Sequence, residues 1–88
     1  MDLKDLRYFI AVYESKGFSK ASESLGTVQS NVSARILGLE RTVSAPLFER
    51  KWRTVVPTEK GERFYEYAKQ VISALDHTER TFKPPRAA

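Results

Sequence analysis

The stretch Gly17–Glu40, which reads GFSKASESLGTVQSNVSARILGLE, decides the fold. It contains two segments whose apolar residues follow helical spacing, and only Gly26 and Thr27 separate them. In the shorter segment, Ala21 and Leu25 lie one helical turn apart, so both side chains face the same side of a helix. Two helices joined by such a tight, glycine-containing turn are typical of a helix-turn-helix motif.

The longer segment is predicted to form a helix from about Val28 to Val43. Its apolar residues recur at steps of three and four, which at about 100° per residue confines them to an arc of roughly 80°. We expect this row to face the core: Val28, Val32, Ile36, Leu39 and Val43. The opposite, outward face then carries Ser30, Ala34, Leu37 and Arg41.

The head of this helix is unusually polar, because Ser and Asn compete with a helix for backbone hydrogen bonds. One interpretation is a capping turn that satisfies unpaired backbone N–H groups. The other is a recognition helix, in which Gln29 pairs with an adenine edge while short neighbours bring the positive helix end close to DNA. The preceding short helix and tight turn favour the second interpretation. We assign to DNA reading Gln29, Ser30, Asn31, Ser33, Ala34 and Arg35.

A first helix is predicted over residues 2–15, with Asp2 as its N-cap and Asp5 in its first turn. We expect Gly17 to help end it, because glycine readily adopts positive φ, and Ser19 to cap the next helix. The apolar stripe of the first helix comprises Leu3, Leu6, Phe9, Ile10 and Tyr13. We also expect partial burial of Tyr8, Tyr65 and Tyr67.

Two short β-rich runs, residues 47–50 and 54–57, flank a basic tip and predict a small hairpin. Such a tip can lie along a DNA backbone or insert arginine into a narrow minor groove, and the alternative is a solvated turn. We expect Trp52 to pack in the core beneath the hairpin, with stacking on nucleic acid as the alternative. We assign Arg50, Lys51 and Arg53 to wing contacts, and Ser19, Lys20 and Arg41 to contacts with the DNA backbone.

A long helix is predicted from Glu59, capped by Thr58, to about Arg80, which gives a length near 33 Å at about 1.5 Å per residue. Its apolar stripe comprises Gly61, Phe64, Ala68, Val71, Ile72, Leu75 and Phe82. Residues 1–57 are too few to cover this stripe, so we expect a second copy to cover part of it across a two-fold axis. The alternative is a monomer with a frayed C-terminal half. The residues assigned to the dimer interface are Phe64, Ala68, Val71, Ile72 and Leu75.

The composition narrows the function classes. The net charge of +4 in 88 residues favours a nucleic-acid partner for a single small domain. The chain has no cysteine and one histidine, His77, so we expect no metal site and no cofactor. No run approaches 18 apolar residues and the N-terminus is charged, so we expect a soluble, cytoplasmic protein with no membrane partner. No catalytic constellation is apparent, so we expect no enzyme activity.

The ordered series of motifs over residues 1–80 resembles the N-terminal DNA-binding domain of LysR-type transcriptional regulators. The motifs are LRYF (6–9), GFSKASESL (17–25), QSNVS (29–33), PLFER (46–50) and TEKG (58–61). The resemblance implies a mainly α, winged helix-turn-helix fold, with three helices and a short two-stranded β-hairpin wing, followed by a long linker helix that dimerises. It also implies sequence-specific binding of double-stranded DNA near promoters.

The resemblance implies groove-reading roles for the polar residues Gln29, Ser30, Asn31 and Ser33, with Arg53 as the wing arginine and Arg50 as a structural residue. Val28 departs from the family pattern, because many members have Ser or Thr there as the N-cap, and Thr27 is the alternative cap. Ala34, Leu37 and Gly38 also depart from it, since these sites are often basic or carry an amide.

We therefore expect a DNA-binding domain over residues 1–58, a linker helix over 59–81 and a tail over 82–88. Family members normally carry a larger domain that senses a small-molecule inducer, so this chain is expected to be a DNA-binding fragment without such a ligand. It is expected to be a homodimer, with a tetramer possible in the full-length parent. The alternative is a winged-helix protein-interaction or assembly module that does not bind DNA.

Overall fold

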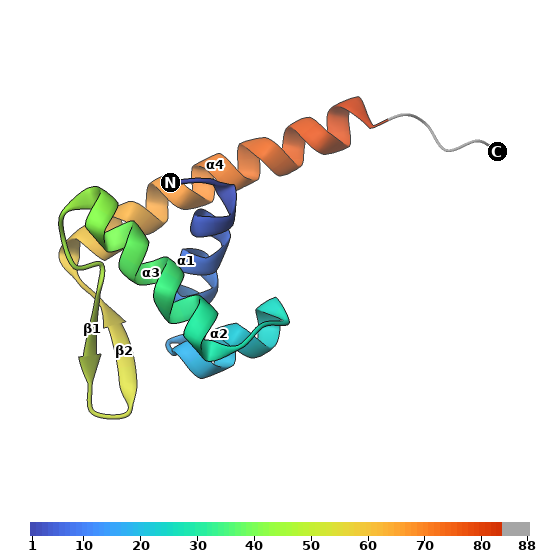
Figure 1. Cartoon of the computed structure of the whole chain (residues 1–88). Coiled ribbons are helices and arrows are strands. Elements are labelled where there is room, and N and C mark those ends of the chain that lie inside the picture. The colour runs from blue at the N-terminus through green and yellow to red at the C-terminus, as the bar shows by residue number, and fades with distance from the viewer. Residues whose placement is uncertain (84–88) are drawn as a thin grey trace.

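Figure 1 shows the computed structural model, which describes residues 1–83. The elements in chain order are α1 (Leu3–Ser15), α2 (Phe18–Leu25), α3 (Gln29–Val43), β1 (Phe48–Lys51), β2 (Thr54–Pro57) and α4 (Glu59–Phe82). The first three helices pack together, the antiparallel hairpin projects beside α3, and α4 runs past the body and away from it (Figure 1). This arrangement confirms the predicted mainly α winged helix-turn-helix with a long final helix. None of the helices within residues 1–83 combines the length and apolar character that a membrane crossing requires.

The left-handed residue that ends α1 lies one residue before its predicted place, and the N-cap of α2 lies two residues before its own. Asp2 caps α1 as expected, and its carboxylate accepts from the backbone N–H of Asp5 at 2.8 Å while Asp5 accepts from that of Asp2 at 2.9 Å. The left-handed residue that ends α1 is Lys16, with φ of 58°, and not Gly17. Because the reversal comes one residue early, Gly17 becomes the N-cap of α2 and Ser19 lies inside its first turn. The prediction of Ser19 as the N-cap is therefore wrong.

The turn between α2 and α3 depends on Gly26, which has φ of 68° and donates its N–H to carbonyls near the end of α2. Val28 is the N-cap of α3, with extended backbone and no capping side chain. It is 60% exposed, because a residue before the helix lies outside the helical angular series. Its prediction as the first core residue of α3 is wrong. Thr27 does not cap the backbone either, since its Oγ1 accepts from the side chain of Asn31 at 2.9 Å.

The core lies where α1, α3 and the start of α4 converge. Phe9 is fully buried, and its ring packs 4.9 Å from that of Phe48 and 4.7 Å from that of Phe64, measured between centroids. The inward row of α3 is confirmed for Val32, Ile36 and Leu39, which are all buried. Three expectations of burial are wrong: Leu3, at the start of α1, Tyr67, on α4, and Trp52, at the hairpin tip, are all exposed.

The wing is attached to the body through its base. Phe48 pairs with Pro57 and Lys51 with Thr54, which leaves a two-residue loop at the tip. The Glu40 carboxylate of α3 accepts from the backbone N–H of Leu47 at 2.6 Å and from that of Phe48 at 3.2 Å. These two bonds fix the start of β1 against α3. The wing therefore has a defined position relative to the helix-turn-helix.

Helix α4 begins at the base of the wing. Thr58 caps it as predicted, because its Oγ1 accepts from the N–H of Gly61 at 3.0 Å and donates to the carbonyl of Pro46 at 2.8 Å. Gly61 lies against the backbone carbonyl of Leu47, where a side chain would collide with it. The close approach of α4 to the wing therefore requires glycine at this position.

A seam of polar and aromatic contacts joins α1 to α4. The rings of Tyr13 and Tyr65 stack with centroids 3.8 Å apart and an angle of 6° between their planes. The Tyr65 hydroxyl donates to Glu14 at 2.5 Å, and this hydrogen bond raises the pKa of Tyr65 to about 12 because it favours the protonated phenol. The Nζ of Lys69 lies 3.6 Å from the same carboxylate. Together these contacts fix the direction in which α4 leaves the body.

Beyond this seam, α4 is largely uncovered. Val71 is 44% exposed and Phe82 is 80% exposed, so Phe82 does not belong to a buried stripe within this chain. The molecule is elongated as a result, with principal extents of 53, 24 and 18 Å. The helix continues to Phe82, two residues beyond its predicted end. Of the predicted tail over residues 82–88, residues 84–88 lie outside the part of the chain that the structure describes.

Candidate nucleic-acid interface

The polar head of α3 lies on the surface. Gln29, Ser30 and Asn31 are exposed, as is Ala34, whereas Ser33 is half-buried. Their orientation follows from the buried row on the other side of α3, since a helix that buries one face must present the opposite one. The hydrogen bond from Asn31 to Thr27 orients the Asn31 amide. The structure thus places short polar side chains where another molecule can reach them.

The N-termini of α2 and α3 differ from those of the other two helices. Helices α1 and α4 have side-chain caps, from Asp2 and Thr58. Helices α2 and α3 begin at Gly17 and Val28, neither of which makes a capping hydrogen bond through a side chain. Because no side chain caps them, the N–H groups at the very start of these two helices remain for water or for an anion, which the helix dipole also favours.

Both of these N-termini border one groove of about 700 Å³. The groove lies between the first turn of α2, the start of α3 and the outer part of the wing. In Figure 1, α2 and the tip of the wing lie on the side of the molecule opposite to α4. Its lining includes four cationic side chains, Lys16, Lys20, Arg50 and Arg53, and no carboxylate from residues 1–83. A concave surface with one sign of charge attracts a polyanion. This groove gathers the cationic side chains of the candidate interface on one concave surface.

The wing side of the groove is held by contacts with the α1–α2 turn. The carbonyl of Lys16 accepts from the N–H of Val55 at 3.4 Å. The guanidinium carbon of Arg50 lies 4.6 Å from the centre of the Phe18 ring. Arg50 therefore packs between the wing and α2, in agreement with the structural role that the family resemblance implied. Lys51 lies outside the groove lining, with its Nζ 3.7 Å from a carboxylate oxygen of Glu49.

Leu37 has a structural explanation that the sequence did not provide. It is 49% exposed and borders a second groove, of about 260 Å³, between α3 and β1. The rings of Phe18 and Phe48 line this groove, and Arg50 lies at the boundary with the first groove. Leu37 thus extends the apolar surface beneath the wing. No signal in the sequence identifies this neighbourhood, because it depends on how β1 packs beside α3.

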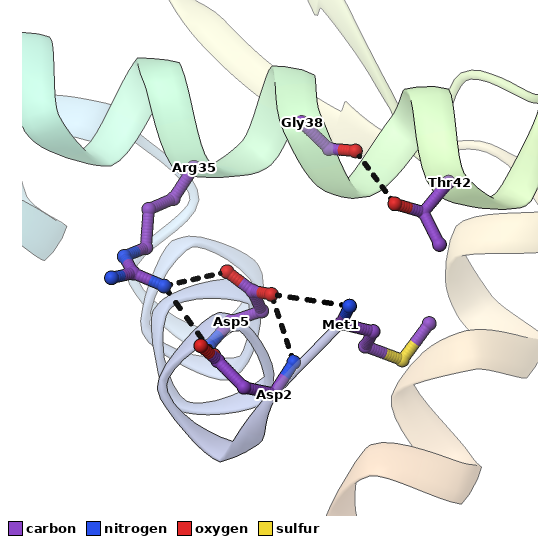
Figure 2. Close-up of polar contacts among 6 residues, drawn as sticks. All are labelled: Met1, Asp2, Asp5, Arg35, Gly38 and Thr42. Carbon is purple, nitrogen blue, oxygen red and sulfur yellow. Dashed lines mark hydrogen bonds and ion pairs between the residues drawn. The ribbon is translucent and has the colours of Figure 1, made fainter.

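Arg35 extends from α3 toward Asp2 and Asp5 at the start of α1 (Figure 2). Its Nη1 lies 2.8 Å from a carboxylate oxygen of Asp5 and 3.3 Å from one of Asp2. The hydrogen bond to Asp5 raises the pKa of Arg35. The guanidinium also lies 5.4 Å from the centre of the Tyr8 ring. Arg35 is engaged within the chain, where it ties α3 to α1, and its assignment to DNA contact stays a prediction.

The remaining assigned residues fall into two groups. The 700 Å³ groove brings together Ser19, Lys20, Gln29, Arg50 and Arg53. Arg41 lies in the last turn of α3 and does not line it. Lys16 and Trp52 do line it, although sequence reasoning assigned neither to DNA contact. Lys16 could not be found from spacing, because its position depends on the unexpected left-handed conformation.

The residues assigned to the dimer interface are divided by their burial. Ala68 is 2% exposed and Phe64 packs on Phe9, so both belong to the core of this chain. They are removed from the interface assignment, because α1 of the same chain already covers them. Val71 is exposed, and Ile72 and Leu75 are half-buried.

Comparisons with known proteins agree with this geometry. The family described as "Bacterial regulatory helix-turn-helix protein, lysR family" matches residues 3–62. The regulator BudR of Raoultella terrigena is 43% identical over 76 residues, which are 86% of this chain and 26% of BudR. The regulator BenM of Acinetobacter baylyi is 41% identical over 76 residues, which are 86% of this chain and 25% of BenM. The chain therefore spans about a quarter of the length of these relatives.

A solved structure of the BenM DBD in complex with benA site 1 DNA is also similar. It superposes with a TM-score of 0.90 at 38% sequence identity. The match covers 94% of this chain and 93% of that one, so it includes the wing and most of α4.

Proposed function

This chain belongs to the LysR family of bacterial helix-turn-helix regulators, and on that premise we propose that it binds double-stranded DNA sequence-specifically as a homodimer. The observation that carries the proposal is the groove without carboxylates, which joins the head of α3, the first turn of α2 and the wing. Relatives that share this domain are transcriptional regulators, not enzymes. For the whole protein, we propose a cytoplasmic transcriptional regulator.

In the proposed complex, the N-terminal half of α3 enters the major groove. Gln29 reads a base edge with its paired donor and acceptor, because its side chain is exposed at the start of the helix. Ser30, Asn31, Ser33 and Ala34 are small, which lets the helix backbone come close to the bases. These contacts supply the choice of sequence.

The surrounding groove supplies phosphate contacts. Lys20 and Ser19 lie in the first turn of α2, where uncapped N–H groups add further donors. Arg53, at the wing tip, binds the adjacent backbone or minor groove. Contacts of this kind provide much of the affinity and make it dependent on salt.

The proposed dimer contact is the exposed length of α4. Val71, Ile72 and Leu75 form an apolar surface on the C-terminal half of α4, where Val71 is exposed, Leu75 is half-buried and Ile72 also packs against the core of its own chain. A two-fold axis along this surface places two α3 helices on half-sites about one DNA turn apart, or a small multiple of it. In the whole protein, two such dimers can form a tetramer.

A salt titration tests the proposal. The chain and an Arg53→Ala variant are titrated against random-sequence duplex DNA at several ionic strengths, with Arg80→Ala, at the far end of α4, as the matched control. The affinity of the parent chain should fall steeply with salt, and Arg53→Ala should reduce the slope by about 1. A weak, salt-independent interaction would instead support the protein-interaction module.

Selection of bound sequences from a random duplex pool then tests specificity. We expect a recurrent half-site in two copies related by a two-fold axis. Recovery of sequences without any common element would contradict sequence-specific binding even if the salt titration succeeded.

A further inference from the structure

The tip of the wing carries a large apolar side chain that the fold does not bury. Trp52 is the only tryptophan of the protein, and it is 88% exposed. It is the most exposed large hydrophobic side chain among residues 1–83. An exposed apolar side chain of this size gains nothing from the fold of its own chain.

The backbone at Trp52 is also unfavourable for tryptophan. Trp52 and Arg53 form the two-residue loop of the hairpin, and Trp52 has φ of 43°. Tight hairpin turns usually place Gly, Asn or Asp at a position with positive φ, because a bulky side chain is strained there. Strain that no packing within the chain offsets indicates a functional contact. Within residues 1–83, the indole has no aromatic ring stacked on it and makes a single cation–π contact, with the guanidinium carbon of Arg53 at 5.6 Å from the ring centre.

The surroundings of Trp52 indicate which class of molecule binds the indole. Trp52 lines the same groove as Gln29 and the cationic side chains of Lys16, Lys20 and Arg53, and no carboxylate lines it. The matching partner is a polyanion that also offers an apolar surface between its charges. The minor groove of duplex DNA has both properties, since sugar walls and base edges lie between two rows of phosphates, and apolar side chains insert there in other proteins.

We propose that Trp52 inserts its indole into the minor groove that flanks the major-groove site of α3, while Arg53 binds a phosphate of the same groove. This inference rests on the proposed DNA-binding function and extends it to a specific apolar contact. Insertion is easiest at flexible pyrimidine–purine steps, so the wing gives a sequence preference outside the half-site that α3 reads.

The single tryptophan makes the contact directly observable. Indole emission is recorded with excitation that tyrosine does not absorb, while the chain is titrated with a duplex selected from the random pool. We expect DNA to quench the emission and to reduce its accessibility to acrylamide. A minor-groove-binding polyamide that occupies the flanking step should restore both, because it competes for the same groove.

Two substitutions separate the contact from the fold of the wing. Trp52→Gly suits the positive φ and so preserves the turn, but it removes the indole. We expect it to weaken DNA binding at least about fivefold, as loss of an aromatic contact with nucleic acid does. Trp52→Phe keeps a ring and should lose less. The polyamide should lower the DNA affinity of the unsubstituted chain and of Trp52→Phe, and it should leave that of Trp52→Gly unchanged.

The possible failures are distinguishable. If the parent chain does not bind DNA, the proposed function and this inference fall together. If it binds DNA while the Trp52 emission and accessibility stay unchanged, or if Trp52→Gly binds as tightly as the parent, this inference alone is overturned. Quenching that the polyamide leaves unaltered would place the indole on the outer backbone and overturn insertion into the minor groove.

Discussion

At the scale of the residue, Gly61 shows how one missing side chain sets the distance between two elements. It lies in the first turn of α4, where the backbone carbonyl of Leu47 occupies the space of a Cβ atom. That carbonyl also accepts from the N–H of Thr58 at 3.0 Å, so it is not free to move. The junction between the wing and α4 therefore depends on glycine.

We predict that Gly61→Ala destabilises the protein. Alanine gains up to about 1 kcal/mol of helix propensity, but the collision with a fixed backbone carbonyl is severe and costs about 2–3 kcal/mol, so the net loss is on the order of 1–2 kcal/mol. The free energy of unfolding, from urea titration, measures it. Gly38→Ala is the matched control, because a Cβ there meets nothing within 4 Å, and it should stabilise by about 0.5–1 kcal/mol. Equal effects of the two variants would contradict the argument.

Gln29 acts at the same scale in recognition. We predict that Gln29→Ala weakens binding to the selected half-site by about 1–3 kcal/mol and relaxes base choice at one position. Competition between specific and random duplexes measures both effects. Ser24→Ala, on the exposed surface of α2 outside the groove lining, is a suitable control. A loss of the same size on all sequences would assign Gln29 to the phosphate backbone instead.

At the scale of the element, the ends of helices could be predicted from the sequence where their contacts are local. The caps of α1 and α4 by Asp2 and Thr58, and the stop at Gly26, involve partners within a few residues and follow from the residue types. The left-handed Lys16 could not be predicted in this way, because glycine follows it directly and is the usual choice for that conformation.

Contacts between elements were the part that the sequence did not reveal. The sequence pattern predicts Arg35 as an outward cation on α3, yet its carboxylate partners, Asp5 and Asp2, lie 30 and 33 residues earlier in the chain. The bonds from Glu40 to the base of the wing and the apolar surroundings of Leu37 likewise depend on packing between elements. The polar head of α3 was predictable, because the core row on the same helix fixes its direction.

The capping cluster of α1 predicts a dependence of stability on pH. The backbone N–H of Asp5 lowers the pKa of Asp2 below its ordinary value of 3.8, with a further contribution from Arg35. The charged form is therefore favoured in the folded state, and this stability is present above pH 3.8 and lost as the pH falls through the lower, folded-state pKa.

Asp2→Asn keeps an N-cap acceptor and removes the charge. Its melting temperature should lie below that of the parent at neutral pH, and the difference should shrink as the pH falls below 3.8. Thermal melts followed by circular dichroism measure it, with the exposed Glu23→Gln as a control for general charge effects. A difference that stays constant across this range would show that the charge of Asp2 contributes nothing.

At the scale of the whole molecule, the elongated shape divides two tasks between opposite ends. The groove, the polar head of α3 and the wing tip lie at one end, and the uncovered length of α4 extends at the other (Figure 1). A helix that projects beyond its own body with exposed Val71 and half-buried Leu75 is suited to a second copy. The two tasks can therefore be disrupted separately.

We predict that Val71→Asp shifts the chain toward the monomer, because it introduces an unpaired charge into the proposed apolar contact. The dimer dissociation constant should rise at least about tenfold, equivalent to about 1.4 kcal/mol. Sedimentation equilibrium measures it. Ser73→Asp, an exposed residue on another side of α4, is the matched control and should change little. If both variants dimerise like the parent, the contact lies elsewhere.

Tyr13 stacks on Tyr65, and Glu14 accepts a hydrogen bond from the Tyr65 hydroxyl, so these contacts make a rigid junction between α1 and α4. In the proposed dimer, this junction sets the distance between the two α3 helices, because it fixes the angle at which each α4 leaves its own body. The spacing between the two half-sites of an operator then depends on Tyr13, Glu14 and Tyr65, which do not line the basic groove. A regulator of this design can acquire operators of new architecture by altering this junction, while its reading residues and their chosen bases stay the same.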